Sequence, residues 1–287
     1  MKKLKKLTAL LTALGMVAAL SACGSSAASS DAGDGNTAGS AAASNAAPAA
    51  TEAAAPAEAG STAETAAADG DTYLIGICQL VQHEALDAAT QGFKDALTEK
   101  LGDKVKFDEQ NASGDSANCS TIVNGFLSEN VDLILANATA PLQAAAAATS
   151  EIPVLGTSVT DYATALEISD WTGTVGNNVS GTSDLAPLDQ QAAMIKELFP
   201  DAKKVGLLYC SAEPNSVYQC DTIEGYLKDE GYEVERYAFT DTNDVTSVTQ
   251  TACDNSDVIY IPTDNTAASN TEAIANVVLP AGVPVVA

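Results

Sequence analysis

The sequence predicts an α/β fold made of two Rossmann-like lobes with parallel sheets. Between residues 72 and 287, short β-rich runs alternate with amphipathic helical stretches, and this order occurs twice. Short phrases also recur at matching places in the two copies. Asp132-Leu133-Ile134 corresponds to Asp257-Val258-Ile259, and Ile152-Pro153-Val154 corresponds to Val283-Pro284-Val285. Two matching α/β units in one chain are therefore expected.

The first copy, residues 72–160, has the order β-α-β-α-β-α-β. Its first helical stretch carries Leu86, Phe93 and Leu97 on one face, which is the periodicity of a helix packed on a sheet. Because crossovers between parallel strands are right-handed and helical, this order predicts a parallel sheet. We expect strands at 73–78, 105–108, 131–136 and 152–156, and helices at 86–101, 116–128 and 140–149.

The second copy, residues 192–287, repeats the order, and residues 161–191 are expected to form the crossover or hinge region between the lobes. Ala287 directly follows the last predicted strand. Since parallel sheets are covered by helices on both faces, we expect that the chain is truncated and that the second lobe is incomplete at its C-terminus. Strands are expected at 204–209, 233–238, 257–262 and 283–286, and helices at 194–198, 215–230, 245–252 and 266–278.

The N-terminal segment has the layout of a secretory signal peptide, residues 1–22. Four lysines precede an apolar stretch that is too short for a stable membrane span. Leu20-Ser21-Ala22-Cys23 resembles the bacterial lipobox, which implies that Cys23 is acylated and anchors the protein outside the cytoplasm. An ordinary signal peptide that happens to end in cysteine is the alternative. Residues 23–71, which begin with the lipidated cysteine, are expected to be a disordered linker. After Cys23 this segment contains no aromatic residue and no Leu, Ile or Val.

Charge and cysteine content exclude several function classes. The formal net charge is −25, and without the four lysines of the signal peptide the remainder carries −29, which argues against nucleic acid and against docking on anionic lipid. Cys78, Cys119, Cys210, Cys220 and Cys253 leave an odd number of thiols, and a Cys210–Cys220 bridge is one open option. There is no C-x-x-C spacing and only one histidine, so we expect no metal and no cofactor. Arg236 is the only arginine, and therefore the only candidate for an arginine clamp.

Polar residues follow the predicted strands of both lobes, where open α/β sheets bind ligands. Helix N-terminal amides and hydroxyls there would bind a carboxylate, and Asp161, Asp184 or Asp264 would pair with an ammonium group. Each such residue taken singly is as often a helix N-cap. We therefore expect a small zwitterionic ligand in the cleft between the lobes, with no catalytic residue. The candidate ligand-binding residues are Gln79, His83, Glu84, Thr139, Ser158, Thr160, Asp161, Ser183, Asp184, Asn215, Ser216, Asp264 and Asn265.

Several runs resemble the solute-binding proteins of ABC transporters, in particular the tryptophan/tyrosine-type binding lipoproteins. The similar runs begin at Gly76-Ile77-Cys78-Gln79 and include Asp108-Glu109-Gln110-Asn111-Ala112, Pro262-Thr263-Asp264-Asn265 and Gly181-Thr182-Ser183-Asp184-Leu185. The resemblance implies a type I periplasmic-binding-protein-like fold. It also implies a lipid-anchored extracytoplasmic receptor that delivers an aromatic amino acid to a permease and its ATPase.

Three alternatives to amino-acid transport remain. A sugar or nucleoside receptor of the same fold is disfavoured because such sites use flat aromatic faces and arginine, and the chain has one tryptophan and one arginine. A non-transport sensor or adhesin of the same fold stays open. An enzyme on this scaffold is disfavoured because no nucleophile elbow, phosphate loop or dinucleotide fingerprint is present.

Overall fold

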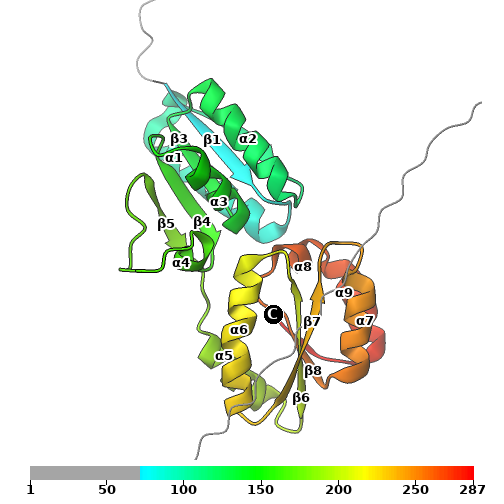
Figure 1. The fold of residues 1–287 in the computed structure, drawn as a ribbon. Coiled ribbons are helices and arrows are strands. Elements are labelled where there is room, and N and C mark those ends of the chain that lie inside the picture. The colour runs from blue at the N-terminus through cyan, green and yellow to red at the C-terminus, as the bar shows by residue number, and fades with distance from the viewer. Residues whose placement is uncertain (1–71) are drawn as a thin grey trace, which may run out of the picture. The chain divides into compact units, whose positions relative to one another are not determined.

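The computed structural model describes residues 72–287, which form two parallel sheets with helices packed on them (Figure 1). The strand order is β2-β1-β3-β4-β5 in the first sheet and β7-β6-β8-β9 in the second. Each neighbouring pair is parallel, which confirms the predicted α/β class with two parallel sheets. The predicted signal peptide, Cys23 and the linker lie outside the described residues.

Lobe 1, residues 72–183, contains the five-stranded sheet. Its helices lie on both faces: α1 packs on one face, and α2 and α3 pack on the other (Figure 1). The strands are β1 (Tyr73–Gln79), β2 (Val105–Asn111), β3 (Leu133–Asn137), β4 (Val154–Val159) and β5 (Val179–Ser183). The helices are α1 (Glu84–Leu101), the short 3₁₀ helix η1 (Gly102–Lys104), α2 (Ser116–Glu129), α3 (Thr139–Ala148) and α4 (Tyr162–Ala165).

Lobe 2, residues 188–287, contains the four-stranded sheet and two clusters of buried apolar residues. Its strands are β6 (Lys204–Cys210), β7 (Glu233–Phe239), β8 (Val258–Tyr260) and β9 (Val285–Val286). Its helices are α5 (Leu188–Leu198), α6 (Pro214–Asp229), α7 (Val245–Asn255), α8 (Asn265–Ser269) and α9 (Thr271–Ala281).

Strand β1 shows why the central strands read as unbroken apolar runs. Successive side chains point to opposite faces of a strand, and here both faces are covered by helices. Ile75 and Ile77 pack on the face that carries α1, whereas Cys78 packs on the face that carries α2 and α3. Gly76 lies on the same face as Cys78, and a Cβ atom there would come within 2.7 Å of the Phe126 ring. The glycine thus lets α2 pack closely on the sheet.

Several elements differ from the sequence-based expectation. Helix α5, expected at 194–198, begins at Leu188, within the expected crossover region. The expected crossover region 161–191 contains strand β5, which joins the first sheet beside β4. Only Val179 of β5 is buried, because β5 is an edge strand, so its sequence lacks an apolar run. The expected helix 266–278 is split into α8 and α9, because the Asn270 side chain donates to the Thr266 carbonyl at 2.8 Å and ends the first segment.

No helix within residues 72–287 is both long enough and apolar enough to cross a membrane.

Candidate functional site

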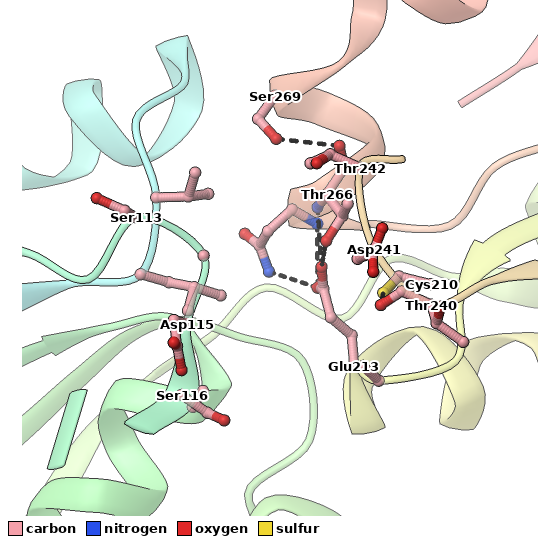
Figure 2. A pocket seen from close by; sticks show the side chains of 16 residues that line it. Ser113, Asp115, Ser116, Cys210, Glu213, Thr240, Asp241, Thr242, Thr266 and Ser269 are labelled. Atoms are coloured by element: carbon pink, nitrogen blue, oxygen red, sulfur yellow. Dashed lines mark hydrogen bonds between the residues drawn. The ribbon is translucent and has the colours of Figure 1, made fainter. Parts of the chain in front are cut away.

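A cavity of about 250 Å³ lies where loops following the strands of both sheets come together (Figure 2). The carboxyl ends of parallel strands share one edge of their sheet, so the loops after β1, β2, β6, β7 and β8 are gathered at these edges. The residues that line the cavity are Leu80, Val81, Ser113, Gly114, Asp115, Ser116, Ala140, Cys210, Ala212, Glu213, Thr240, Asp241, Thr242, Asn265, Thr266 and Ser269. We call this cavity the strand-end pocket.

The chemistry of the strand-end pocket is polar and acidic. Hydroxyls, one amide and three carboxylates line it, together with apolar side chains that include Leu80, Val81 and Ala140. Among the described residues that line it, none is lysine, arginine, histidine or aromatic. A ligand here meets hydrogen-bonding groups of both kinds, but it meets no cationic side chain.

The β2–α2 loop supplies four consecutive residues of the pocket. Ser113 and Gly114 both have positive φ, of 56° and 80°, and the tight turn is held because Asn111 Oδ1 accepts the Ser113 N–H at 2.8 Å. The Gly114 N–H donates to the Leu80 carbonyl at 2.8 Å, which ties this loop to the β1–α1 loop. Asp115 then caps α2, since its carboxylate accepts the Ala117 N–H at 2.7 Å. The first turn of α2 therefore begins at the pocket.

Glu213 organises the lobe 2 wall of the pocket (Figure 2). Its carboxylate is buried and accepts five hydrogen bonds from three residues. Thr266 donates its backbone N–H at 2.8 Å and its hydroxyl at 2.7 Å to Oε1. Asn265 donates its backbone N–H at 3.1 Å and its side-chain amide at 2.8 Å to Oε2. Asn215 donates its side-chain amide to the same oxygen at 3.1 Å. The carboxylate thus fixes the start of α8 against the β6–α6 loop.

Asp264 is a second buried carboxyl group behind this wall. It accepts the Cys210 N–H at 2.6 Å and the Ala267 N–H at 2.8 Å, so it caps α8 and holds the end of β6. Burial, and after it the negative charge of the neighbouring Glu213, raise the pKa of Asp264 to about 7. This carboxyl group therefore changes its protonation state close to neutral pH.

A buried polar network occupies the ends of β1 and β3. The Gln79 side chain is 4% exposed; it donates to the Val81 carbonyl at 2.9 Å and to the Asp87 carboxylate at 2.7 Å. It also accepts the Thr90 hydroxyl at 2.6 Å. Asn137 donates its amide to the Leu86 carbonyl at 2.8 Å and to the Thr90 hydroxyl oxygen at 2.9 Å. The network supports the β1–α1 loop from within the lobe.

Two polar contacts join residues of the first sheet's loops to residues of lobe 2. His83 Nε2 lies 3.3 Å from Asn265 Oδ1. The side-chain amide nitrogen of Gln219 on α6 donates to the Thr160 hydroxyl oxygen at 3.5 Å. The amide oxygen of Gln219 accepts the Thr263 hydroxyl at 2.8 Å. Asn265 therefore contacts both Glu213 and His83.

The structure brings one of the sequence-predicted site residues, Asn265, into the strand-end pocket. The others lie at strand ends but in different settings. Gln79, Thr139, Thr160, Asn215, Ser216 and Asp264 are buried; Asp161 caps α4, and Ser183 donates to the Thr160 carbonyl at 2.7 Å. His83 and Glu84 line an outer hollow at the start of α1, Ser158 has a positive φ of 55°, and Asp184 is exposed. Their roles as ligand contacts stay predictions.

Sequence reasoning missed the contributions of β2 and β7. Ser113, Asp115 and Ser116 follow β2, and Asp241 and Thr242 follow β7. Both strands are edge strands, and their sequences are less apolar than those of the central strands, so the loops that follow them are harder to recognise as strand ends. The loop after β2 could have been recognised from its turn residues, which directly follow a strand: Asn111-Ala112-Ser113-Gly114-Asp115.

The remaining sequence candidates lie away from the pocket. Arg236 pairs with Asp221 and Glu224 on α6. The five cysteines of the described residues are all buried thiols, so the optional Cys210–Cys220 bridge is not formed. Within residues 72–287, no group of three or more metal-ligating side chains is close enough to hold a metal ion.

Comparison with protein families gives one match for most of the described chain. Residues 74–287 match the family described as ABC transporter substrate binding protein. A curated relative, the tyrosine-binding protein of Clostridioides difficile strain R20291, is 38% identical over 216 residues, which is 74% of this chain. The aligned region spans 62% of the length of that relative.

Solved structures agree with the family match. An ABC domain from Streptococcus pneumonia in complex with L-Trp is 33% identical with a TM-score of 0.71, and a conserved domain protein from Vibrio cholerae is 35% identical with a TM-score of 0.72. A ligand-free, open substrate-binding protein with adhesive properties from Clostridium difficile is 36% identical with a TM-score of 0.53. Each alignment covers 75% of this chain and 73% of the other chain.

Proposed function

Because the chain belongs to the family of ABC transporter substrate-binding proteins, we propose that it is the extracytoplasmic solute-binding component of an ABC importer. Its ligand is a small zwitterion, an aromatic amino acid, held in the strand-end pocket. Its partners are a permease with its ATPase, and the membrane through a lipid on Cys23. The observation that carries the ligand class is the composition of the pocket wall.

The pocket offers separate groups for the two charges of an amino acid. Hydroxyls of Ser113, Ser116 and Thr242 are donors for a carboxylate, and the N-terminal end of the α2 dipole favours its negative charge. Asp115 and Asp241 are carboxylates that an ammonium group would pair with. A volume of about 250 Å³ is small for a ligand pocket, which favours a ligand of single-amino-acid size.

The side-chain class of the ligand is supported by the relatives. One relative is named for tyrosine and another was solved with L-Trp, and both are more than 30% identical to this chain. A sugar is disfavoured because none of the described residues lining the pocket is aromatic, so no flat face is available for stacking.

A thermal-shift series with matched ligands tests this proposal. The chain is heated with L-Trp, L-Tyr, L-Phe, tryptamine, which lacks the carboxylate, and indole-3-propionate, which lacks the ammonium group. An aromatic amino acid at about 100 times its Kd adds about 2.7 kcal/mol to the free energy of unfolding, and both truncated analogues give smaller shifts. Shifts with sugars or nucleosides alone, or no shift with any of these compounds, contradict the proposal.

Two substitutions locate the ligand within the pocket. Asp241→Asn weakens amino-acid binding about tenfold or more, because it removes the charge from one hydrogen-bonded ion pair. Asp254→Asn, an exposed carboxylate on α7, is the matched control and leaves the affinity unchanged. Equal affinities for the two variants would place the ligand elsewhere.

The lipid anchor is tested separately on Cys23, which lies outside the described residues. Cells expressing the chain are labelled with a radioactive or clickable fatty acid, and the Cys23→Ala variant is compared with the parent. Label in the parent and none in the variant is the expected outcome. Secretion of an unlabelled parent chain would instead identify an ordinary signal peptide.

A further inference from the structure

His83 is the only histidine of the chain, and its side chain contacts the other lobe. It follows β1 of lobe 1, and its Nε2 atom lies 3.3 Å from Oδ1 of Asn265, the first residue of α8 in lobe 2. Both residues are half-buried. Val81, two residues before His83, lines the strand-end pocket, and so does Asn265. The contact therefore lies directly beside the pocket.

Glu213 fixes the direction of this hydrogen bond. The side-chain amide nitrogen of Asn265 donates to Glu213 Oε2 at 2.8 Å, and the Asn265 backbone N–H donates to the same oxygen at 3.1 Å. Since a carboxylate only accepts hydrogen bonds, the amide nitrogen of Asn265 faces Glu213 and the amide oxygen faces His83. The Nε2 atom of His83 therefore carries the hydrogen and donates it. The β1–α1 loop is thus joined, through Asn265, to the buried carboxylate that organises the lobe 2 wall.

The position of His83 at the start of α1 does not account for its residue type. His83 is the N-cap residue of α1, where Ser, Thr, Asp and Asn are preferred because their side chains accept N–H groups of the first turn. The His83 side chain makes no such hydrogen bond. The hydrogen bond that its imidazole makes is the one to Asn265 in lobe 2. The residue type therefore suits a contact between the lobes better than a helix cap.

The strand order places this contact far from the connection between the lobes. Within the described residues, that connection is residues 184–187, directly after β5. Neighbouring strands are about 4.8 Å apart, so in the order β2-β1-β3-β4-β5 strand β4 lies about 5 Å from β5 and β1 about 14 Å from it. Thr160, after β4, meets Gln219 in a buried contact. A rotation of the lobes about residues 184–187 would therefore open the His83–Asn265 contact farther than the buried one.

We propose that His83 is a positioning residue for ligand binding, which latches the β1–α1 loop onto the first residue of α8 and so holds the strand-end pocket closed. This role rests on the proposed function, because a latch matters where a ligand is enclosed between two lobes. It requires no contact between His83 and the ligand. A ligand that contacts both lobes binds the closed form, so a smaller closed population raises the apparent Kd in proportion.

Nuclear magnetic resonance of the single imidazole tests the contact without any ligand. The whole chain is labelled with isotopic histidine, so that every imidazole signal comes from His83. Asn265→Ala is expected to shift these signals, because it removes the acceptor of the Nε2 hydrogen. Asn255→Ala, on an exposed asparagine at the end of α7, is the matched control and leaves them in place. Imidazole signals that are unchanged in Asn265→Ala overturn the proposal.

Two substitutions separate the latch from helix capping. His83→Ser supplies a capping hydroxyl but cannot reach Asn265, so the melting temperature rises by roughly 2 to 4 °C. Amino-acid binding nevertheless weakens about three- to tenfold, because the hydrogen bond between the lobes is lost. His83→Gln retains an amide donor and loses less affinity than His83→Ser. Equal affinities of His83→Ser and the parent overturn the proposal, as does a loss of affinity that appears only together with a loss of stability.

A double-variant cycle assigns the loss of affinity to the His83–Asn265 pair. His83→Ala is expected to weaken binding in the parent and to cause no further loss in an Asn265→Ala background, because the partner of the imidazole is already absent. Additive losses overturn the proposal. Failure of every amino acid to bind the parent chain would contradict the proposed function, whereas the imidazole signals would still decide whether His83 holds the start of α8.

Discussion

Asp264 and Glu213 are two buried carboxyl groups that hold the same short helix. Asp264 accepts the Ala267 N–H at 2.8 Å, and Glu213 accepts the Thr266 N–H at 2.8 Å. Among the described residues, all hydrogen-bond donors to the two carboxyl groups are neutral. No cationic donor therefore offsets the repulsion between them. The lobe 2 wall of the pocket therefore responds to protonation of Asp264.

Stability of the chain is expected to fall as the pH rises from 4 to 7. Asp264 has a folded-state pKa of about 7, above its unfolded value of about 3.9, so the folded chain binds an extra proton between these values. The stabilisation is fully present below about pH 4 and is lost as pH rises through 7, and it amounts to at most about 4 kcal/mol. Asp264→Asn flattens this profile, as measured by urea unfolding at several pH values.

The matched control for this profile is Asp229→Asn, an exposed carboxylate at the end of α6. It retains the parent pH dependence, including the part that arises from general charge repulsion. Parallel pH profiles for the Asp264 variant and the parent would show that Asp264 is not the titrating group.

Glu213→Gln is expected to destabilise the chain by about 2 to 3 kcal/mol and to weaken ligand binding. The glutamine amide group would face the donors of Asn215, Asn265 or Thr266, which leaves buried donors without an acceptor. Denaturant unfolding gives the first effect, and a ligand titration gives the second. Glu230→Gln, on an exposed residue after α6, changes neither quantity. If the Glu213 variant were as stable as the parent and bound the ligand with full affinity, Glu213 would not organise the lobe 2 wall of the pocket.

The repeated apolar runs were sufficient to predict both sheets, because central parallel strands bury both faces and leave a continuous hydrophobic signal. Strand β1, expected at 73–78, is found at Tyr73–Gln79. Edge strand β5 gave no such signal, since Ser180, Gly181, Thr182 and Ser183 are exposed. The short helix α8 was merged with α9 because the helical periodicity continues across Asn270.

The sequence indicated the loops around the candidate pocket better than it indicated the side chains that line it. In a parallel sheet the carboxyl ends of all strands lie at one edge, so the loops that follow the strands of each sheet are gathered there. The direction of each side chain depends on local hydrogen bonds that the sequence does not reveal. Gln79 is such a case, since Val81, Asp87 and Thr90 take up its amide within the lobe.

Arg236 is expected to contribute to stability but not to ligand binding. Its guanidinium donates to Asp221 and to Glu224, each at 2.7 Å, with the side chain 33% exposed, and it does not line the pocket. Arg236→Gln lowers the free energy of unfolding by about 1 kcal/mol at low salt and by less at high salt. The ligand Kd stays unchanged in calorimetric titration. A large rise in Kd would restore Arg236 as the clamp that the sequence allowed.

Gly156 and Tyr162 are expected to be coupled energetically. A Cβ atom on Gly156 would collide with the Tyr162 hydroxyl, which donates to the Thr182 carbonyl at 3.2 Å. Gly156→Ala therefore destabilises the chain by about 1 to 3 kcal/mol, and Tyr162→Phe alone costs about 1 kcal/mol. In the double variant the hydroxyl that collides is gone, so the loss is smaller than the sum of the two single losses, as a urea-unfolding cycle would measure.

Two further glycines, Gly92 and Gly181, differ in the space available for an added Cβ atom. Gly92→Ala on α1, where an added Cβ meets nothing within 4 Å, stabilises the chain by about 0.5 to 1 kcal/mol. Gly181→Ala remains destabilising even when combined with Tyr162→Phe, because its Cβ would also collide with the Gly156 carbonyl and its φ of 155° disfavours a side chain. Rescue of Gly181→Ala by Tyr162→Phe would mean that the hydroxyl, and not the β4 backbone, requires glycine at position 181.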